Sequence, residues 1–186
     1  MHSFIKMKKD LYNEIEIPEG VEATFGENVL KIKGELGENA REFNLGRLDL
    51  DIKDKKIILG NKISTKTEKK MMNTITAHIK NMIRGVQEKF EYTLKICHSH
   101  FPFTVKMDGN KIIIKNFLGE KVDRLGTVPE GVNVEIKKEI ITVSGINKEL
   151  VGQGAANFEA ITKIRGRDTR IFQDGVYIIN KCGRKI

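Results

Sequence analysis

Basic side chains gather in one stretch of the chain, next to a glycine. Residues 163–170 read Lys-Ile-Arg-Gly-Arg-Asp-Thr-Arg, and Lys181, Arg184 and Lys185 follow in the final residues. From Lys163 onward there are seven Lys or Arg and two Asp or Glu, a net charge of +5, whereas the whole chain carries only +8. A basic excess concentrated in this way is typical of surfaces that bind polyanions.

The spacing within this stretch predicts a loop, because Gly, Asp and Thr separate its arginines. The planar guanidinium group matches phosphate geometry and stacks on unpaired bases. Glycine lets a backbone approach a ligand closely, and Asp168 is expected to orient a neighbouring arginine or to cap the turn. We predict contact with RNA by shape and charge rather than by sequence reading. The predicted RNA-binding residues are Lys163, Arg165, Gly166, Arg167, Arg170, Lys181, Arg184 and Lys185.

Other residues are of types that bind metals or nucleotides or take part in catalysis, but their spacing does not complete such a site. Cys97 and the pair His98 and His100 are metal-ligand types, but on a strand the cysteine would point away from the histidines, and no Cys-x₂-Cys pair occurs elsewhere. Gly152-x-Gly154 opens a predicted helix, yet Asn157 replaces the third glycine of a dinucleotide fingerprint. No nucleophile elbow or catalytic carboxylate pair is recognisable. We therefore expect no enzyme, no metal and no cofactor.

Composition indicates a globular protein. Hydrophobic residues make up 39% of the chain and charged residues 31%, and there is no Trp. No apolar run approaches the ~20 residues of a membrane span, and the first residues lack the apolar block of a signal peptide. Cys97 and Cys182 suit two free thiols in a reducing compartment. These features predict a soluble, intracellular protein.

A short sequence occurs twice, which predicts an internal duplication. Pro18-Glu19-Gly20-Val21 reappears 111 residues later as Pro129-Glu130-Gly131-Val132, and the following apolar positions keep the same alternation. We therefore predict two similar domains, residues 1–85 with a net charge of +3 and residues 86–186.

Periodicity predicts the elements of the first domain. Residues 1–10 are expected to form a loosely held arm. Alternation of apolar and polar residues predicts strands at 21–25, 29–33, 47–52 and 56–60. A capping box formed by Thr65 and Glu68 begins a predicted helix at 64–84, and Gly85 is expected to end it.

The second domain has the same kinds of signal. Asn147 is expected to cap a helix whose apolar stripe includes Val151, Ala155 and Phe158. Asp108-Gly109 and Asp174-Gly175 are expected to form hairpin turns, the latter between strands at 171–172 and 176–179. The fold class is therefore α+β, with two tandem copies of a small antiparallel sheet and one packed helix. The other predicted strands lie at 90–97, 103–107, 111–116, 121–128, 132–137 and 140–144.

Five stretches carry a resemblance that covers nearly the whole chain: 82–90, 95–102, 116–121, 145–157 and 165–177. Together they resemble the sixth large-subunit ribosomal protein family. The match is to the archaeal and eukaryotic branch, whose eukaryotic member is called the ninth large-subunit protein. Gly154 stands where a threonine is expected in that branch, and the ending at 181–186 departs from the family pattern.

The resemblance implies a non-enzymatic protein of the large ribosomal subunit in the cytoplasm. It implies binding to large-subunit ribosomal RNA near the base of the lateral stalk, close to where translational GTPases dock. The RNA contacts of the family lie mainly in its second domain, and its basic loop corresponds here to Arg165, Gly166, Arg167 and Arg170, flanked by Lys163. The first domain is expected to contact neighbouring ribosomal proteins or peripheral RNA.

Two alternatives remain open at this stage. The first is a free RNA-binding regulator or chaperone outside the ribosome. The second is a nucleotide-dependent enzyme that uses Gly152 and Gly154.

Overall fold

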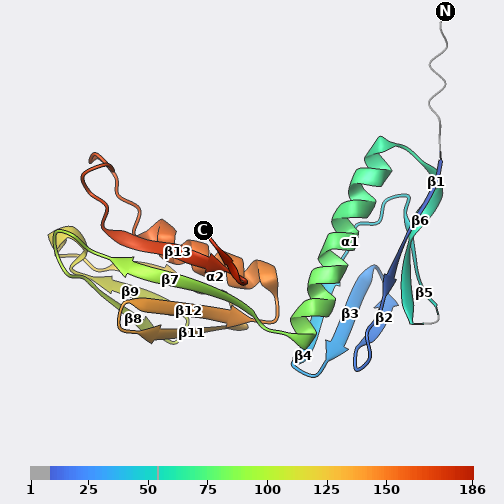
Figure 1. Cartoon of the computed structure of the whole chain (residues 1–186), viewed down its shortest axis with the longest axis horizontal. Coiled ribbons are helices and arrows are strands. Elements are labelled where there is room, and N and C mark those ends of the chain that lie inside the picture. The colour runs from blue at the N-terminus through green and yellow to red at the C-terminus, as the bar shows by residue number, and fades with distance from the viewer. Residues whose placement is uncertain (1–8, 54) are drawn as a thin grey trace, which may run out of the picture. The chain divides into compact units, whose positions relative to one another are not determined.

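The computed structural model describes residues 9–53 and 55–186 (Figure 1). The chain divides into two compact units, Met1–Glu88 and Lys89–Ile186. Of the predicted arm at 1–10, residues 1–8 lie outside the described residues, while Lys9 and Asp10 already belong to the first strand. Among the described residues, no helix is long and apolar enough to cross a membrane.

The first unit packs one helix against two small antiparallel sheets. Helix α1 spans Lys66–Gln87, and each sheet has three strands, in the orders β1-β6-β5 and β2-β3-β4. The hydrophobic pattern does not predict β1 or β4, because the charged and polar residues of both strands dilute the alternation. The strands are β1 (Lys9–Glu16), β2 (Glu22–Gly26), β3 (Val29–Gly34), β4 (Gly37–Glu42), β5 (Asp49–Lys53) and β6 (Lys56–Ser64).

Helix α1 begins as the sequence predicts but ends later. Both halves of the capping box between Thr65 and Glu68 are present. The prediction that Gly85 ends the helix is wrong, since the helix continues to Gln87. Val86 explains the extension: its side chain is fully buried, and its carbonyl accepts a 3.1 Å hydrogen bond from the N–H of Leu36. This tertiary packing outweighs the low helix propensity of glycine.

The second unit has a five-stranded antiparallel sheet, a three-stranded one and helix α2 (Lys148–Ile161). The strand orders are β11-β12-β7-β13-β14 and β10-β9-β8. A 3₁₀ turn, η1, covers Phe117–Gly119. The strands are β7 (Phe90–Cys97), β8 (Thr104–Asp108), β9 (Lys111–Lys115), β10 (Arg124–Thr127), β11 (Val132–Lys137), β12 (Ile140–Gly145), β13 (Gly175–Lys181) and β14 (Arg184–Lys185).

Helix α2 matches its prediction closely. The Asn147 side chain accepts hydrogen bonds from the first backbone N–H groups of the helix, and Val151, Ala155 and Phe158 are fully buried. A Cβ on Gly154 would lie 3.5–3.6 Å from three valine side chains, which is ordinary van der Waals contact, so the packing of the helix on the sheet does not require glycine here. The buried residues of the second unit, with Leu94, Ile112, Ile114 and Phe117 among them, form a single cluster.

The duplication is confirmed, but the equivalence of residues drawn from the repeated tetrapeptide is wrong. Sheet β1-β6-β5 of the first unit corresponds to β7-β12-β11 of the second, and β2-β3-β4 corresponds to β8-β9-β10. An offset of 111 residues instead pairs β2 and β3 with β11 and β12, which belong to the other sheet. Both are hairpins that follow Pro-Glu-Gly-Val, so they share the alternating pattern without being equivalent.

Substitution of Gly60 tests the pairing of the unpredicted strand β1 with β6. An added Cβ would lie 2.3 Å from the carbonyl oxygen of Leu11 and 2.8 Å from the Cα of Tyr12, both backbone atoms. We expect Gly60→Ala to lower the free energy of unfolding by about 1 to 3 kcal/mol, because the two strands must separate locally. Urea denaturation followed by circular dichroism measures the change.

Gly26→Ala is the matched control, since nothing lies within 4 Å of the added Cβ. Equal stability of the two variants would contradict the observed register of β1 on β6.

Candidate nucleic-acid interface

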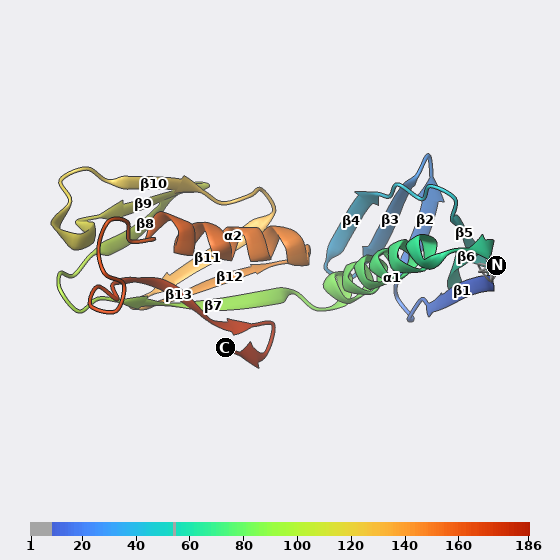
Figure 2. The same ribbon diagram turned by 90° about the horizontal axis from the view of Figure 1, so that it is seen from above.

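The structure divides the eight predicted RNA-binding residues into two groups. Lys163, Arg165, Gly166, Arg167 and Arg170 lie on the segment between α2 and β13, here called the basic loop (residues 163–174). Lys181, Arg184 and Lys185 lie on the β13–β14 hairpin. The two groups flank opposite ends of β13 (Figure 2), and the strand's length at about 3.3 Å per residue separates them by roughly 20 Å.

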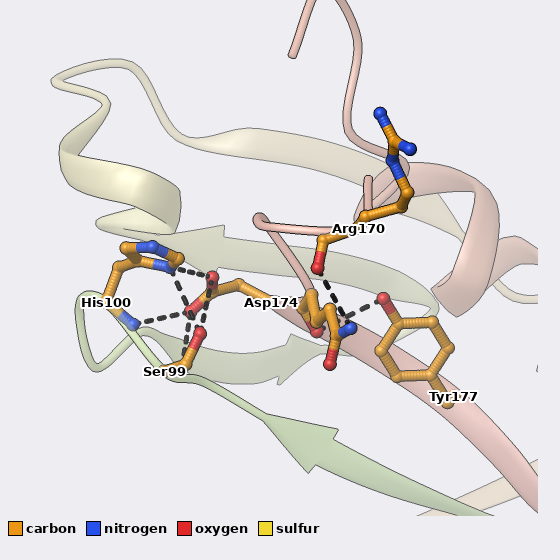
Figure 3. A network of polar contacts seen from close by, with 6 residues as sticks. Ser99, His100, Arg170, Asp174 and Tyr177 are labelled. Atoms are coloured by element: carbon orange, nitrogen blue, oxygen red, sulfur yellow. Dashed lines mark hydrogen bonds and ion pairs between the residues drawn. The ribbon is translucent and has the colours of Figure 1, made fainter. Parts of the chain in front are cut away.

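A buried carboxylate anchors the end of the basic loop (Figure 3). Asp174 is 1% exposed. Its Oδ1 accepts the backbone N–H groups of Ser99 at 2.7 Å and His100 at 3.0 Å, and its Oδ2 lies 2.6 Å from the His100 ring Nδ1. Burial alone would raise the pKa of Asp174, but these hydrogen bonds outweigh it and lower the pKa from 3.8 to about 2.

This anchor corrects the predicted hairpin around Asp174-Gly175. Residues 171–172 form no strand, and β13 pairs instead with β7, with Gly175 opposite Cys97. The aspartate does not form a turn, because its side chain closes off the end of β7 through Ser99 and His100.

An arginine that the sequence analysis overlooks anchors the start of the loop. Arg124 donates from Nη1 to the carbonyl of Ile161 at 2.8 Å and to that of Lys163 at 3.2 Å, and so neutralises the carboxyl end of α2. Its Nε donates to Glu120 at 2.7 Å, and its Cζ lies 4.2 Å from the centroid of the Phe117 ring. The hydrogen bond from Arg124 lowers the pKa of Glu120.

Aromatic contacts hold the middle of the loop. The Phe172 ring stacks on the His100 ring with centroids 4.6 Å apart and planes 19° apart. The guanidinium carbon of Arg167 lies 4.8 Å from the centroid of the same Phe172 ring, a cation–π contact. Tyr177 donates from its hydroxyl to the carbonyl of Gln173 at 3.2 Å. Arg167 is therefore oriented before any ligand is present.

Asp168 orients Arg170, as predicted. Its carboxylate accepts from Arg170 Nε at 3.1 Å, from Nη2 at 2.9 Å and from the backbone N–H at 2.9 Å. The side-chain hydrogen bond from Arg170 lowers the pKa of Asp168 and raises that of Arg170. This fork fixes the guanidinium and balances its charge locally.

The remaining cations of the two groups are exposed. Across residues 9–53 and 55–186, the structure shows no ion pair for Lys163, Arg165, Lys181, Arg184 or Lys185. Gly166 has a φ of +71° with nothing within 4 Å of an added Cβ, so its backbone is open on that side. Cys182 and Gly183 both have positive φ and make the tight turn of the β13–β14 hairpin. These groups are free to meet a polyanion.

The histidines considered as metal ligands have structural partners. His100 contacts Asp174 and Phe172, and the His98 ring meets the Phe103 ring edge-on with centroids 6.4 Å apart. No cluster of three metal-ligating side chains occurs among the described residues. The sequence did not predict that four residues hold the loop in place, because their contacts join segments distant in the chain. These residues are Arg124, His100, Phe172 and Asp174.

The second unit of this duplicated α+β fold presents a pre-ordered basic loop, an arrangement typical of proteins that contact polyanions. The family model described as ribosomal protein L6 matches residues 17–89 and 101–175, one segment in each unit. The chain belongs to this ribosomal protein family, and it is a structural, non-enzymatic constituent of the ribosome. Membership confirms the predicted family, the ribosomal localisation and the absence of an enzymatic role.

Three archaeal proteins, each named large ribosomal subunit protein uL6, are similar over most of their length. The one from Methanobrevibacter smithii is 46% identical over 168 residues, covering 90% of this chain and 94% of the relative. The one from Methanothrix thermoacetophila is 42% identical, covering 94% and 99%. The one from Methanococcus vannielii is 44% identical, covering 92% and 94%.

Asp174→Asn tests the anchor of the loop. At neutral pH we expect the free energy of unfolding to fall by about 2 kcal/mol, because the charge-assisted hydrogen bonds are lost. The folded-state pKa of Asp174 lies below its ordinary value of 3.8. Its carboxylate therefore stabilises the fold above about pH 4, and this contribution is lost as the pH falls toward about 2. The difference between wild type and variant should shrink over that range.

Urea denaturation at several pH values measures this difference. Asp168→Asn is the control, because that carboxylate pairs with an exposed arginine and contributes little. An Asp174→Asn protein as stable as wild type at pH 7 would contradict the anchoring role.

Proposed function

We propose that the chain is a constituent of the large ribosomal subunit that binds large-subunit ribosomal RNA near the base of the lateral stalk, beside the region where translational GTPases dock. The relatives named above support the large subunit. The observation that carries the RNA site is the basic loop, anchored by Arg124 at its start and by Asp174 at its end, with Lys163 and Arg165 exposed.

The loop binds by neutralising phosphates on a rigid frame. Arg167 and Arg170 are already oriented by Phe172 and Asp168, so little side-chain entropy is lost when they meet phosphates. Lys163 and Arg165 add charge, and the open backbone of Gly166 permits close approach. Such contacts position a protein on folded RNA without reading bases.

The β13–β14 hairpin provides a second contact with the same RNA. Its three cations, Lys181, Arg184 and Lys185, are exposed and lie across the length of β13 from the loop. With the basic loop at one end of β13 and the hairpin cations at the other, two contacts fix both the position and the orientation of the second unit on the RNA. We propose that residues 1–85 form the first domain, and that this domain contacts neighbouring ribosomal proteins or peripheral RNA.

Salt-dependent binding to purified archaeal large-subunit ribosomal RNA tests the two contacts separately. Each neutralised phosphate contributes roughly 0.7 to 0.9 to the slope of log affinity against log salt. We expect Arg165→Gln/Arg167→Gln/Arg170→Gln to reduce the slope by about 2 to 3 units, and Lys181→Gln/Arg184→Gln/Lys185→Gln to reduce it similarly. Melting temperatures should stay close to that of wild type.

The control triple variant is Lys89→Gln/Lys106→Gln/Lys111→Gln, which removes three exposed charges of the second unit outside both groups. It should leave the slope nearly unchanged. If all three variants lower the slope equally, overall charge determines binding and the two proposed contacts are wrong.

Cofractionation tests the ribosomal site against the alternative of a free RNA-binding regulator or chaperone. In archaeal lysates separated on sucrose gradients, we expect the chain to remain with large subunits after a high-salt wash, because contacts from two units hold it. A loop variant should partly dissociate in the same wash. Recovery of the wild-type chain mainly in the ribosome-free fraction would support the alternative.

A further inference from the structure

A cavity of about 550 Å³ lies between the second half of α2 and the basic loop. Ala156 and Ala160 line it from the helix, and Val176 and Tyr177 line it from β13. Phe172 lines it from the loop. The volume lies within the range of about 300 to 1,000 Å³ that pockets for small organic groups occupy.

The walls of the cavity combine apolar surface with one aromatic ring that is not already stacked on another ring of the described residues. Ala156 and Ala160 are exposed on α2 and too small to fill the space beside the helix. Phe172 is already stacked on His100, whereas Tyr177 is 44% exposed and held in place by its hydrogen bond to Gln173. Tyr177 therefore offers a ring on which a planar group can stack.

Polar residues also line the cavity. Lys163 and Thr169, both exposed and both on the basic loop, contribute to its lining. Glu159 also lines it, and its Oε1 accepts the backbone N–H of Ile178 at 2.9 Å. Its Oε2 accepts no hydrogen bond from the described residues, so it can accept one from an amino group.

We propose that this cavity takes one unstacked base of the RNA bound by the basic loop. The proposal rests on the proposed function and extends it from phosphate contacts to recognition of a single nucleotide. A base stacks on Tyr177 against the alanines of α2, its phosphate meets Lys163, and Glu159 accepts a hydrogen bond from its amino edge. Adenine, cytosine and guanine carry such an amino group, whereas uracil offers only a ring N–H, so the proposal commits to the first three bases. The positive charge of Lys163 in the lining favours a nucleotide over an apolar side chain of a neighbouring protein.

Filling the cavity from the helix tests the proposal. In Ala160→Leu, leucine keeps the helix propensity high and projects from an exposed position into the cavity. The base can then no longer stack on Tyr177. We therefore expect binding of the variant to archaeal large-subunit ribosomal RNA to weaken by about 5- to 100-fold. The log–log salt slope should not change, because no phosphate contact is lost.

Gln153→Leu is the matched control, because Gln153 is exposed on the same helix and lies outside the cavity lining. It should bind as wild type does. The two proposals can fail separately. If the loop variants do not lower the slope of log affinity against log salt, the proposed RNA contact is wrong. If Ala160→Leu binds RNA with unchanged affinity, only the base pocket is wrong. If Ala160→Leu binds RNA as wild type does but no longer sediments with large subunits, the cavity contacts a neighbouring protein. That result would also overturn the base pocket.

Photocrosslinking of the wild-type chain gives a test that does not depend on folding of a variant. Ultraviolet irradiation of the complex with the same RNA, followed by mass spectrometry, should yield Tyr177 linked to an adenosine, cytidine or guanosine. The crosslink should disappear in Ala160→Leu and persist in Gln153→Leu. Crosslinks confined to residues outside the cavity, or to uridine alone at Tyr177, would overturn the proposal.

Discussion

The carboxylate of Asp174 is the contact on which the candidate interface depends. Few groups are as costly to bury as an ionised carboxylate without partners, and Asp174 is buried with hydrogen bonds from the backbone of Ser99 and His100 and from the His100 ring. These bonds tie the last residue before β13 to the segment that follows β7. The His100 ring then supports Phe172, and Phe172 supports Arg167. The orientation of a surface arginine thus follows from one buried acid.

Within the described part of the chain, the candidate interface lies on segments that only the second unit has, in addition to the duplicated fold: the basic loop, β13 and β14. Among the residues that the structure describes, β1 lies at the edge of its sheet in the first unit, whereas its counterpart β7 pairs with the additional strand β13. Strand β13 is reached from α2 through the basic loop and continues into β14. Strand β13 is held on β7 by a ladder of hydrogen bonds whose register shifts between Ile178 and Asn180. Both segments that flank β13 therefore have fixed ends. The duplicated core provides stability, and the addition carries the exposed charge.

Local patterns were sufficient to predict most elements of this fold. The limits of β7 and β11, the Asn147 cap and the capping box at Thr65 follow from alternation and cap chemistry. Prediction failed where tertiary contacts decide, as at Gly85, where burial of Val86 extends the helix. It also failed where a repeated tetrapeptide suggested equivalence between hairpins of different sheets.

For the candidate site, the sequence indicated which residues are charged but not how each is used. Arg124 caps α2 and Arg170 is held in a fork by Asp168, so part of their binding capacity is already engaged within the protein. Lys163 and Arg165, by contrast, are exposed and show no ion pair within the described residues. An arginine held by the protein, such as Arg170, meets a phosphate in a fixed orientation, whereas a cation surrounded by solvent has no fixed orientation. Both release counterions from RNA when they neutralise a phosphate. Arg124 reaches the carbonyls of Ile161 and Lys163, which lie 37 and 39 residues later in the chain, and no local pattern encodes these contacts. The fork between Asp168 and Arg170 is local, so the sequence could predict it.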